Sequence, residues 1–184
     1  MKTRFEADFK RVKKVAYPNY YMIARAELGL HEQVGPGSNP RIMAMADRVS
    51  RQPGRAWVKT FYASDDVPWC ALGVSDALVQ AGHSIPDNPL SAGAYRMYGT
   101  KLSGPMAGAI AVKARRGGNH VGLVSAISVD GKHLLILGFN QGDAVREDWY
   151  LASVFDAFRA PAGVKLDDLP RRDLTPSAPA ASEA

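Results

Sequence analysis

The stretch that decides the fold is residues 65–82, DDVPWCALGVSDALVQAG, which predicts a buried helix carrying the only cysteine of the chain. Apolar side chains recur along it at the spacing of one helix face; they are Cys70, Val74, Ala77, Leu78 and Ala81. Gly82 is of the residue type that most often ends a helix. The acidic pair Asp65-Asp66 and Pro68 suit a helix start, so Cys70 is expected in the opening turn.

Helical patterns precede this segment and strand patterns follow it. Upstream, the apolar spacing predicts helices near residues 20–28 and 40–49, the second capped by Asn39. One short helix is expected downstream, at 91–98. Downstream, runs rich in Val, Ile, Leu and Phe predict strands at 110–112, 121–129, 134–137 and 154–158. Asp130-Gly131 has the composition of a hairpin turn. This order predicts an α+β domain whose helices pack on one antiparallel sheet.

The length of 184 residues suits one domain with its own core. We expect a basic arm over residues 1–18, a folded domain over 19–161, and a Pro- and Ala-rich tail over 162–184, too poor in large apolar residues to become ordered. Residues 1–14 hold six basic and two acidic side chains, and therefore +4 of the net charge of +5. The arm suits an anionic partner, or is simply a solvated surface segment; a nucleic-acid partner is not expected.

The cysteine and histidine content and the apolar windows exclude several classes of protein. A single cysteine forms neither an intrachain disulfide nor a Cys-rich zinc site. The histidines lack the spacing of a helical metal motif, so no cofactor is expected. No window approaches the ~20 apolar residues of a membrane span, and the basic start lacks the apolar core of a secretory signal. We therefore expect a chain made in the cytoplasm without a transmembrane segment.

Cys70 has the position expected of a nucleophile. A thiol attacks an amide as the thiolate, and the free N–H groups and dipole of a helix start lower the pKa of a thiol. The same N–H groups can hold the oxyanion of a tetrahedral intermediate. The alternative is that Cys70 is a small buried apolar residue on the face of Val74 and Leu78.

Of the four histidines, His120 has the surroundings of an acid/base partner. It follows the Gly-rich residues 116–119 and begins an apolar strand at Val121. We therefore expect it at the end of the sheet beside a loop, partly exposed to substrate. The other three are expected at the surface; they are His31, His83 and His133.

A third polar residue should fix the tautomer of the imidazole. The candidate is Asn140, which ends the strand antiparallel to that of His120. A strict two-residue turn at Asp130-Gly131 would place Gln141 opposite His120, whereas a three-residue loop or one bulge would bring Asn140 to the face of His120. Alternatively, Asn140 and Gln141 only form a turn before Gly142.

Four motifs follow one another along the chain: Pro68-Trp69-Cys70-Ala71, Asn119-His120-Val121-Gly122, Leu137-Gly138-Phe139-Asn140-Gln141 and Phe158-Arg159-Ala160-Pro161. Together with the segment around Glu27 to Ile42, they resemble the CHAP group of cysteine, histidine-dependent amidohydrolases and peptidases, especially its phage-lysin branch. The likeness spans about residues 20–161. It departs from the family at Gly108-Ala109, where Gly-Asp is usual, and at Asn119 and Phe139, where Gly is usual.

The resemblance implies a papain-like fold in which Cys70 is the nucleophile, His120 the general base and Asn140 the orienting residue. Four further residues are expected beside them, in contact with substrate or with the catalytic groups: Glu32, Asp66, Trp69 and Gln141. Of these, Glu32 matches a family position near the active site.

The chemistry implied is attack by the thiolate on an amide in or next to the stem peptide of bacterial peptidoglycan, followed by hydrolysis of the thioester. We expect a cysteine peptidase or amidase of the phage-endolysin type, which reaches the wall after release. Two alternatives stay open. One is an antibacterial effector with the same chemistry and a cognate immunity protein, and the other is a catalytically inactive wall-binding module.

Overall fold

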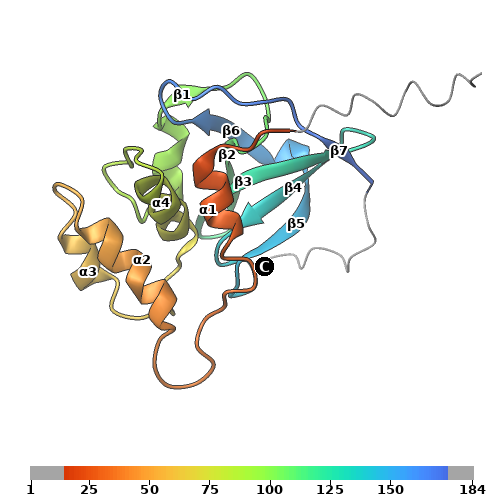
Figure 1. Ribbon diagram of the computed structural model, residues 1–184. Coiled ribbons are helices and arrows are strands. Elements are labelled where there is room, and N and C mark those ends of the chain that lie inside the picture. The colour runs from red at the N-terminus through yellow and green to blue at the C-terminus, as the bar shows by residue number, and fades with distance from the viewer. Residues whose placement is uncertain (1–14, 174–184) are drawn as a thin grey trace, which may run out of the picture.

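The computed structural model describes residues 15–173 and has mixed helical and antiparallel-sheet structure, as expected for the α+β class (Figure 1). The helices are α1 (Asn19–Arg25), α2 (Pro40–Ser50), α3 (Trp57–Phe61), α4 (Cys70–Gln80) and the 3-10 segments η3 (Ala92–Met97) and η4 (Ala152–Val154). The strands are β1 (Thr100–Lys101), β2 (Ile110–Arg115), β3 (Gly118–Ser128), β4 (His133–Gly138), β5 (Arg146–Leu151), β6 (Phe155–Ala160) and β7 (Arg171–Arg172). Residues 1–14, most of the predicted basic arm, lie outside the described range.

The strands form one sheet in the order β1-β6-β2-β3-β4-β5, and β7 adds to β3 in parallel. The helices gather at one side of this sheet in Figure 1, with α2 and α3 furthest from it. The larger apolar core lies between α1, α2, α4 and the sheet, and a second, smaller core lies among residues of β2, β3, β4 and β6. The sheet therefore buries apolar side chains in two clusters.

Helix α4 is the centre of the larger core. Its residues from Cys70 to Leu78 are all buried, because α1 and α2 pack against it on one side and β3 on another. The helix ends where the sequence predicts, since Gly82 adopts a φ of +78° and the amide of His83 donates to the carbonyl of Leu78 at 2.9 Å. A left-handed residue at this point suits glycine, which has no Cβ to clash.

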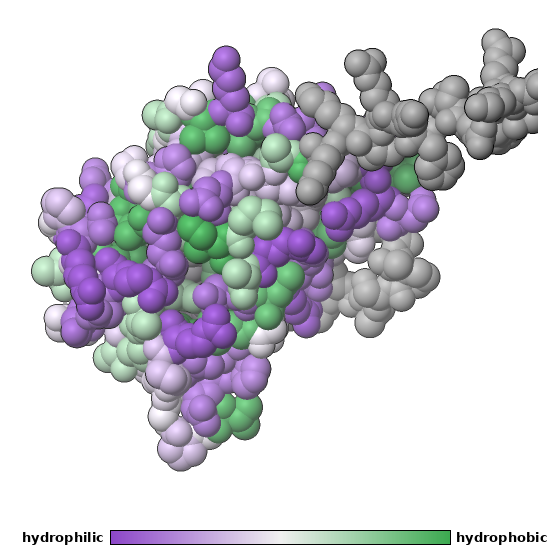
Figure 2. Space-filling view, viewed as in Figure 1, coloured by the Kyte–Doolittle hydropathy of each residue, from purple (hydrophilic) through white to green (hydrophobic). Residues whose placement is uncertain are grey.

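The start of α2 also follows the prediction. Asn39 Oδ1 accepts from the amide of Arg41 at 3.0 Å, and Pro40 occupies the first helical position. The predicted apolar face is buried; it comprises Ile42, Met45, Ala46 and Val49. The loop between α1 and α2 is the lowest part of the molecule as viewed in Figures 1 and 2, and it carries Val34, which is 87% exposed.

The hairpin of β3 and β4 turns at the predicted Asp130-Gly131, where Gly131 has a φ of +75°. Its register shifts between Val124 and Ala126, so β3 contains a bulge at Ser125. Beyond the bulge Gly122 pairs with Gly138. Continuing this register by two residues places Asn140 opposite His120, as the bulged alternative predicted.

The prediction of a disordered tail is wrong for residues 162–173. Leu166 and Leu169 pack against the second core, and the carbonyl of Asp167 accepts from the amide of Ala107 at 2.9 Å. Further along, β7 pairs with β3. The packing of two leucines and the pairing of β7 with β3 thus order a segment whose composition predicted disorder. Residues 174–184 lie outside the described range.

Four more elements escaped sequence analysis, namely α3, β5, the 3-10 segment η4 and the two-residue β1. The side chains of β5 alternate neither in polarity nor clearly in burial, so a period-2 pattern cannot reveal that strand. Within residues 15–173, the structure contains no helix long and apolar enough to cross a membrane.

Candidate active site

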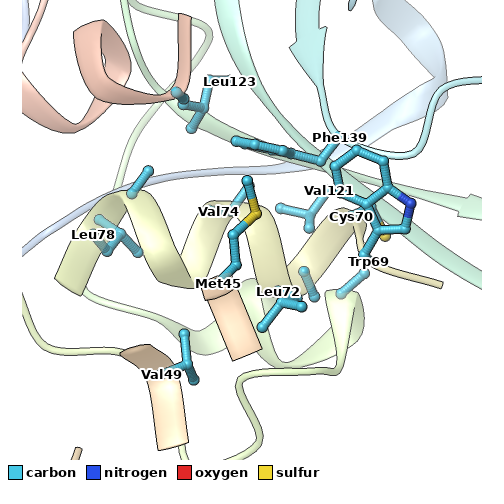
Figure 3. Close-up of a cluster of buried hydrophobic side chains, with 14 of the residues drawn as sticks. Met45, Val49, Trp69, Cys70, Leu72, Val74, Leu78, Val121, Leu123 and Phe139 are labelled. Carbon is cyan, nitrogen blue, oxygen red and sulfur yellow. The ribbon is translucent and has the colours of Figure 1, made fainter. Parts of the chain in front are cut away.

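Cys70 is the first residue of α4 and follows the N-cap residue Trp69. Its side chain is 4% exposed and belongs to the apolar cluster that includes Val121 and Phe139 (Figure 3). The rings of Trp69 and Phe139 meet edge to face with centroids 5.9 Å apart. Position 70 is therefore a helix start held by aromatic packing, and Val121 of the same cluster directly follows His120 in β3.

The residues expected to cap α4 have other partners. Asp65 is buried, and its Oδ2 accepts from the amides of Gln33 and Asn39, each at 2.8 Å. Burial acts to raise the pKa of Asp65, but these backbone hydrogen bonds outweigh it and hold the pKa below its usual value. Asp66 accepts from the hydroxyl of Ser64 at 2.7 Å. Among the described residues no side chain caps the start of α4, so a cap does not occupy the amides of its first turn.

His120 is the third residue of β3 and lies opposite Lys113 of β2. The imidazole is fully buried, whereas the sequence led us to expect partial exposure. The strand β3 begins at Gly118, so His120 lies within the strand and not at its end, and the side chain of Gln141 lies against the ring. The Gly-rich connection between β2 and β3 is a tight turn at residues 116–117.

Gln141 supplies the hydrogen bond to the imidazole that Asn140 was expected to supply. Its Oε1 lies 3.1 Å from Nε2 of His120. The other amide atom, Nε2 of Gln141, donates to the carbonyl of Arg146 at 2.9 Å, with Asp148 Oδ2 at 3.3 Å. Because these neighbours only accept, the orientation of the amide is fixed.

This fixed amide determines the tautomer of His120. An amide oxygen accepts and cannot donate, so Nε2 of the neutral ring carries the proton. The lone pair of the neutral ring is then on Nδ1, which is the nitrogen able to take up a proton. Tyr150 also donates to Gln141 Oε1, at 3.2 Å, and so helps to hold this oxygen in place.

Backbone geometry after β4 explains why Gln141 and not Asn140 reaches the ring. The strand ends at Gly138, and Asn140 adopts a left-handed φ of +57°. This conformation turns the chain, and the Nδ2 of Asn140 donates to Glu32 Oε1 at 2.6 Å. The strands therefore have the bulged register that was expected. The turn at Asn140, however, directs its side chain to Glu32, and the next residue, Gln141, contacts His120.

Glu32 joins the two parts of the site. Its Oε1 accepts from the indole Nε1 of Trp69 at 2.7 Å as well as from Asn140. One oxygen atom therefore connects the residue before Cys70 with the residue before Gln141. Burial raises the pKa of Glu32, the hydrogen bond from Trp69 opposes this, and the nearby carboxylates of Asp143, Asp65 and Asp66 raise it further.

Six of the seven site residues chosen from the sequence thus lie on one chain of contacts. It runs from Cys70 through Trp69, Glu32, Asn140 and Gln141 to His120. Asp66 is not part of this chain, although its charge acts on Glu32.

Sequence analysis missed several residues that shape the site. Tyr150 holds Gln141, and Tyr62 lies within electrostatic reach of Cys70 and Glu32. Burial raises the pKa of Tyr62, and the neighbouring carboxylates add to the effect. Neither tyrosine stands in a recognisable motif, so no local pattern could have singled them out.

Two glycines make room for the site. A Cβ at Gly73 of α4 would lie 2.2 Å from the ring of Phe139, and a Cβ at Gly138 would lie 2.3 Å from Gln141 Oε1. Both distances are far below van der Waals contact, so any larger residue must displace its neighbour. Gly138 belongs to a motif noted in the sequence, but the need for glycine at position 73 shows only in three dimensions.

Among residues 15–173, no group of three or more His, Cys, Asp or Glu side chains is placed to hold a metal ion. Comparison of the chain with protein-family models, with curated proteins and with solved structures finds no match. The functional reading therefore depends on the residues of the site and on the motif resemblance.

Proposed function

We propose that the protein is a papain-like cysteine hydrolase of the CHAP type that cleaves an amide bond in or next to the stem peptide of bacterial peptidoglycan. The observation that carries the proposal is the contact chain through Glu32 Oε1, which ties the start of the cysteine helix to the loop that holds His120. Cys70 is the nucleophile, His120 the general base, and Gln141 the residue that orients the imidazole.

In the first half of the reaction, Nδ1 of His120 takes the proton of the Cys70 thiol, and the thiolate attacks the carbonyl carbon of the substrate amide. The uncapped amides of the first turn of α4 offer donors for the oxyanion, and the helix dipole favours negative charge there. The C–N bond then breaks, the imidazolium returns its proton to the leaving amine, and a thioester remains on Cys70.

In the second half, neutral His120 takes a proton from water, and the resulting hydroxide adds to the thioester carbonyl. Collapse of this intermediate breaks the C–S bond and releases a carboxylic acid, and the imidazolium returns its proton to the Cys70 sulfur. Throughout both halves, Nε2 of His120 keeps its proton and donates a hydrogen bond to Gln141 Oε1, so the ring stays in the productive orientation.

The wall substrate and the biological setting are inferred from the four motifs that resemble the phage-lysin branch. An endolysin released at the end of phage growth and a delivered antibacterial effector would share this chemistry. The genes next to the coding sequence separate them, because a holin gene indicates the first and an immunity-protein gene the second.

The burial of Cys70 favours a second candidate function, a catalytically inactive wall-binding module. In that case the thiol is only a small apolar group of the core beside Val121 and Phe139. The two candidates differ in one measurable property, which is hydrolysis.

The decisive experiment compares Cys70→Ser and His120→Ala with the wild-type protein on purified peptidoglycan. We expect each variant to lose at least about 10³-fold in activity, because nucleophile and base act as one unit. His133→Ala is the control, since this histidine begins the adjacent strand β4 and is partly exposed. Wild-type activity in either site variant would rule out the proposed mechanism, and an inactive wild-type protein that still binds the wall would establish the module.

Mass analysis of the released fragments identifies the bond. New amino termini on alanine or glycine indicate an endopeptidase, whereas free lactyl groups on the glycan indicate an amidase. Either product agrees with the proposed chemistry. Release of intact disaccharides with no amide cleaved would contradict it.

A further inference from the structure

The segment that carries Glu32 is fixed at both sides of the carboxylate. The amide of Glu32 donates to the carbonyl of Asp143 at 2.9 Å, and its neighbour His31 forms a bridge with Ala144. On the other side, Asp65 holds the amide of Gln33 at 2.8 Å. The backbone around Glu32 is thus anchored to the loop after β4 and to the loop before α4. These contacts do not involve the side chain of Glu32.

The side chain then joins the same two loops through one atom. Trp69 and Asn140 both donate to Oε1, at 2.7 and 2.6 Å. Hydrogen bonds to a carboxylate are shorter and stronger than those between neutral groups. Because Trp69 precedes Cys70 and Asn140 precedes Gln141, a shift of Oε1 moves the thiol and the partner of His120 relative to each other.

We propose that Glu32 is a positioning residue that sets the distance between the Cys70 thiol and the His120 imidazole by holding Trp69 and Asn140 on one carboxylate oxygen. The inference rests on the proposed Cys70–His120 hydrolase chemistry and assigns to Glu32 no contact with substrate. Displacement of reacting groups by about 1 Å can cost about 100-fold in rate, so loss of this anchor acts mainly on kcat.

The charge on Glu32 gives the role a pH signature. The groups facing the carboxylate are Asn140 and Asp143 from the loop after β4, Tyr62 after α3, and Asp65, Asp66 and Trp69 from the segment before α4. Burial and these carboxylates raise the pKa of Glu32, so it takes up a proton at a higher pH than an ordinary glutamate. A protonated carboxyl holds its two donors more weakly than a carboxylate, and kcat therefore falls as pH drops through this pKa.

The test measures kcat and KM for Glu32→Ala and Glu32→Gln on a soluble muropeptide. Glu32→Ala should lower kcat about 10- to 100-fold and leave KM within about threefold, because positioning is lost while binding groups remain. Glu32→Gln should give a kcat between those of the wild-type protein and Glu32→Ala, since its neutral amide oxygen still accepts from both donors but more weakly than a carboxylate, and it should lack the acid limb that Glu32 causes. Glu27→Ala is the matched control, because that side chain pairs with Arg41 outside the site.

A double-mutant cycle tests whether Trp69 and Asn140 act on kcat through Glu32. Trp69→Phe and Asn140→Ala should each lower kcat in the wild-type background and add little in the Glu32→Ala background, since the shared oxygen is then already missing. Independent, additive losses would overturn the inference.

The remaining outcomes are equally informative. If Glu32→Ala lowers only the melting temperature and kcat of the folded fraction stays at the wild-type value, Glu32 is structural and the inference fails. If Glu32→Ala does not fold, as judged by circular dichroism, Glu32→Gln decides, because an unchanged acid limb in that variant also overturns the inference. These failures leave the wild-type protein active and Cys70→Ser inactive, whereas failure of the proposed function itself shows as a wild-type protein that cleaves nothing or as a Cys70→Ser variant as active as the wild type.

Discussion

The segment that carries Cys70 and the segment that holds His120 differ in the contacts that position them. Cys70 is placed by apolar packing, in which the Phe139 ring lies against Gly73 of α4 and beside Trp69. His120 is placed by a directed hydrogen bond that its Nε2 donates to Gln141 Oε1, and the amide of Gln141 is in turn fixed by backbone and side-chain acceptors.

This difference determines what each side tolerates. Apolar packing is nondirectional and depends on volume, so it fails through clashes and cavities and shows its cost in stability. A buried hydrogen-bond network depends on direction, so it fails through misorientation and shows its cost in function. Substitutions that change the packed volume around Cys70 should therefore mainly affect folding, and substitutions in the hydrogen-bond network of His120 should mainly affect turnover.

The largest stability effect is expected for Gly73→Ala. The added Cβ would lie 2.2 Å from the Phe139 ring, which cannot yield without moving against Trp69. Overpacking of this kind costs about 1–3 kcal/mol in the free energy of unfolding. Urea denaturation followed by circular dichroism measures the loss. The double variant Gly73→Ala/Phe139→Ala should recover part of it, and a recovery of zero would show that another clash is responsible.

On the histidine side, Gln141→Ala should lower kcat about tenfold or more. The buried hydrogen bond to His120 is worth about 0.5–1.5 kcal/mol, and misorientation of the ring adds to the loss. The measurement is turnover of a soluble muropeptide, with the melting temperature as control. Asn140→Ala should cost less, because its contact reaches the ring only through Glu32 and the backbone. The reverse order would return the orienting role to Asn140.

A smaller effect, outside both halves of the site, is expected for Leu169→Ala. This leucine is partly buried against the second core, so truncation should cost about 1 kcal/mol in the free energy of unfolding and leave kcat unchanged. Leu151→Ala is the control, because that side chain is 52% exposed. Equal stabilities of the two variants would show that the segment of residues 162–173 contributes no apolar packing.

The helix that carries Cys70 could be predicted because its apolar residues recur every three to four positions and glycine marks its end. The hairpin that carries His120 could be predicted from two apolar runs and an Asp-Gly turn. The orienting residue could not be assigned with the same means. A bulge at Ser125 set the register, and the left-handed turn at Asn140 then moved the contact one residue along the chain.

Packing of the C-terminal segment and burial of His120 were also beyond sequence analysis. Residues 162–173 have a composition typical of disorder, and they become ordered because the sheet offers an apolar surface and a strand to pair with. The sequence predicts that His120 begins a strand, but β3 begins two residues earlier and the imidazole is fully buried.

By itself, the sequence determined the elements and the chemical groups: a helix starting near its single thiol, an antiparallel hairpin carrying a histidine, and polar residues at the end of that hairpin. Periodicity and turn chemistry are local properties, so they can be read along the chain. Only the tertiary structure decided which polar groups meet. It brought Glu32 from a distant loop onto both Trp69 and Asn140, and it chose Gln141 as the partner of His120. Such contacts depend on register, backbone turns and the packing of segments far apart in sequence, none of which is encoded by a local pattern.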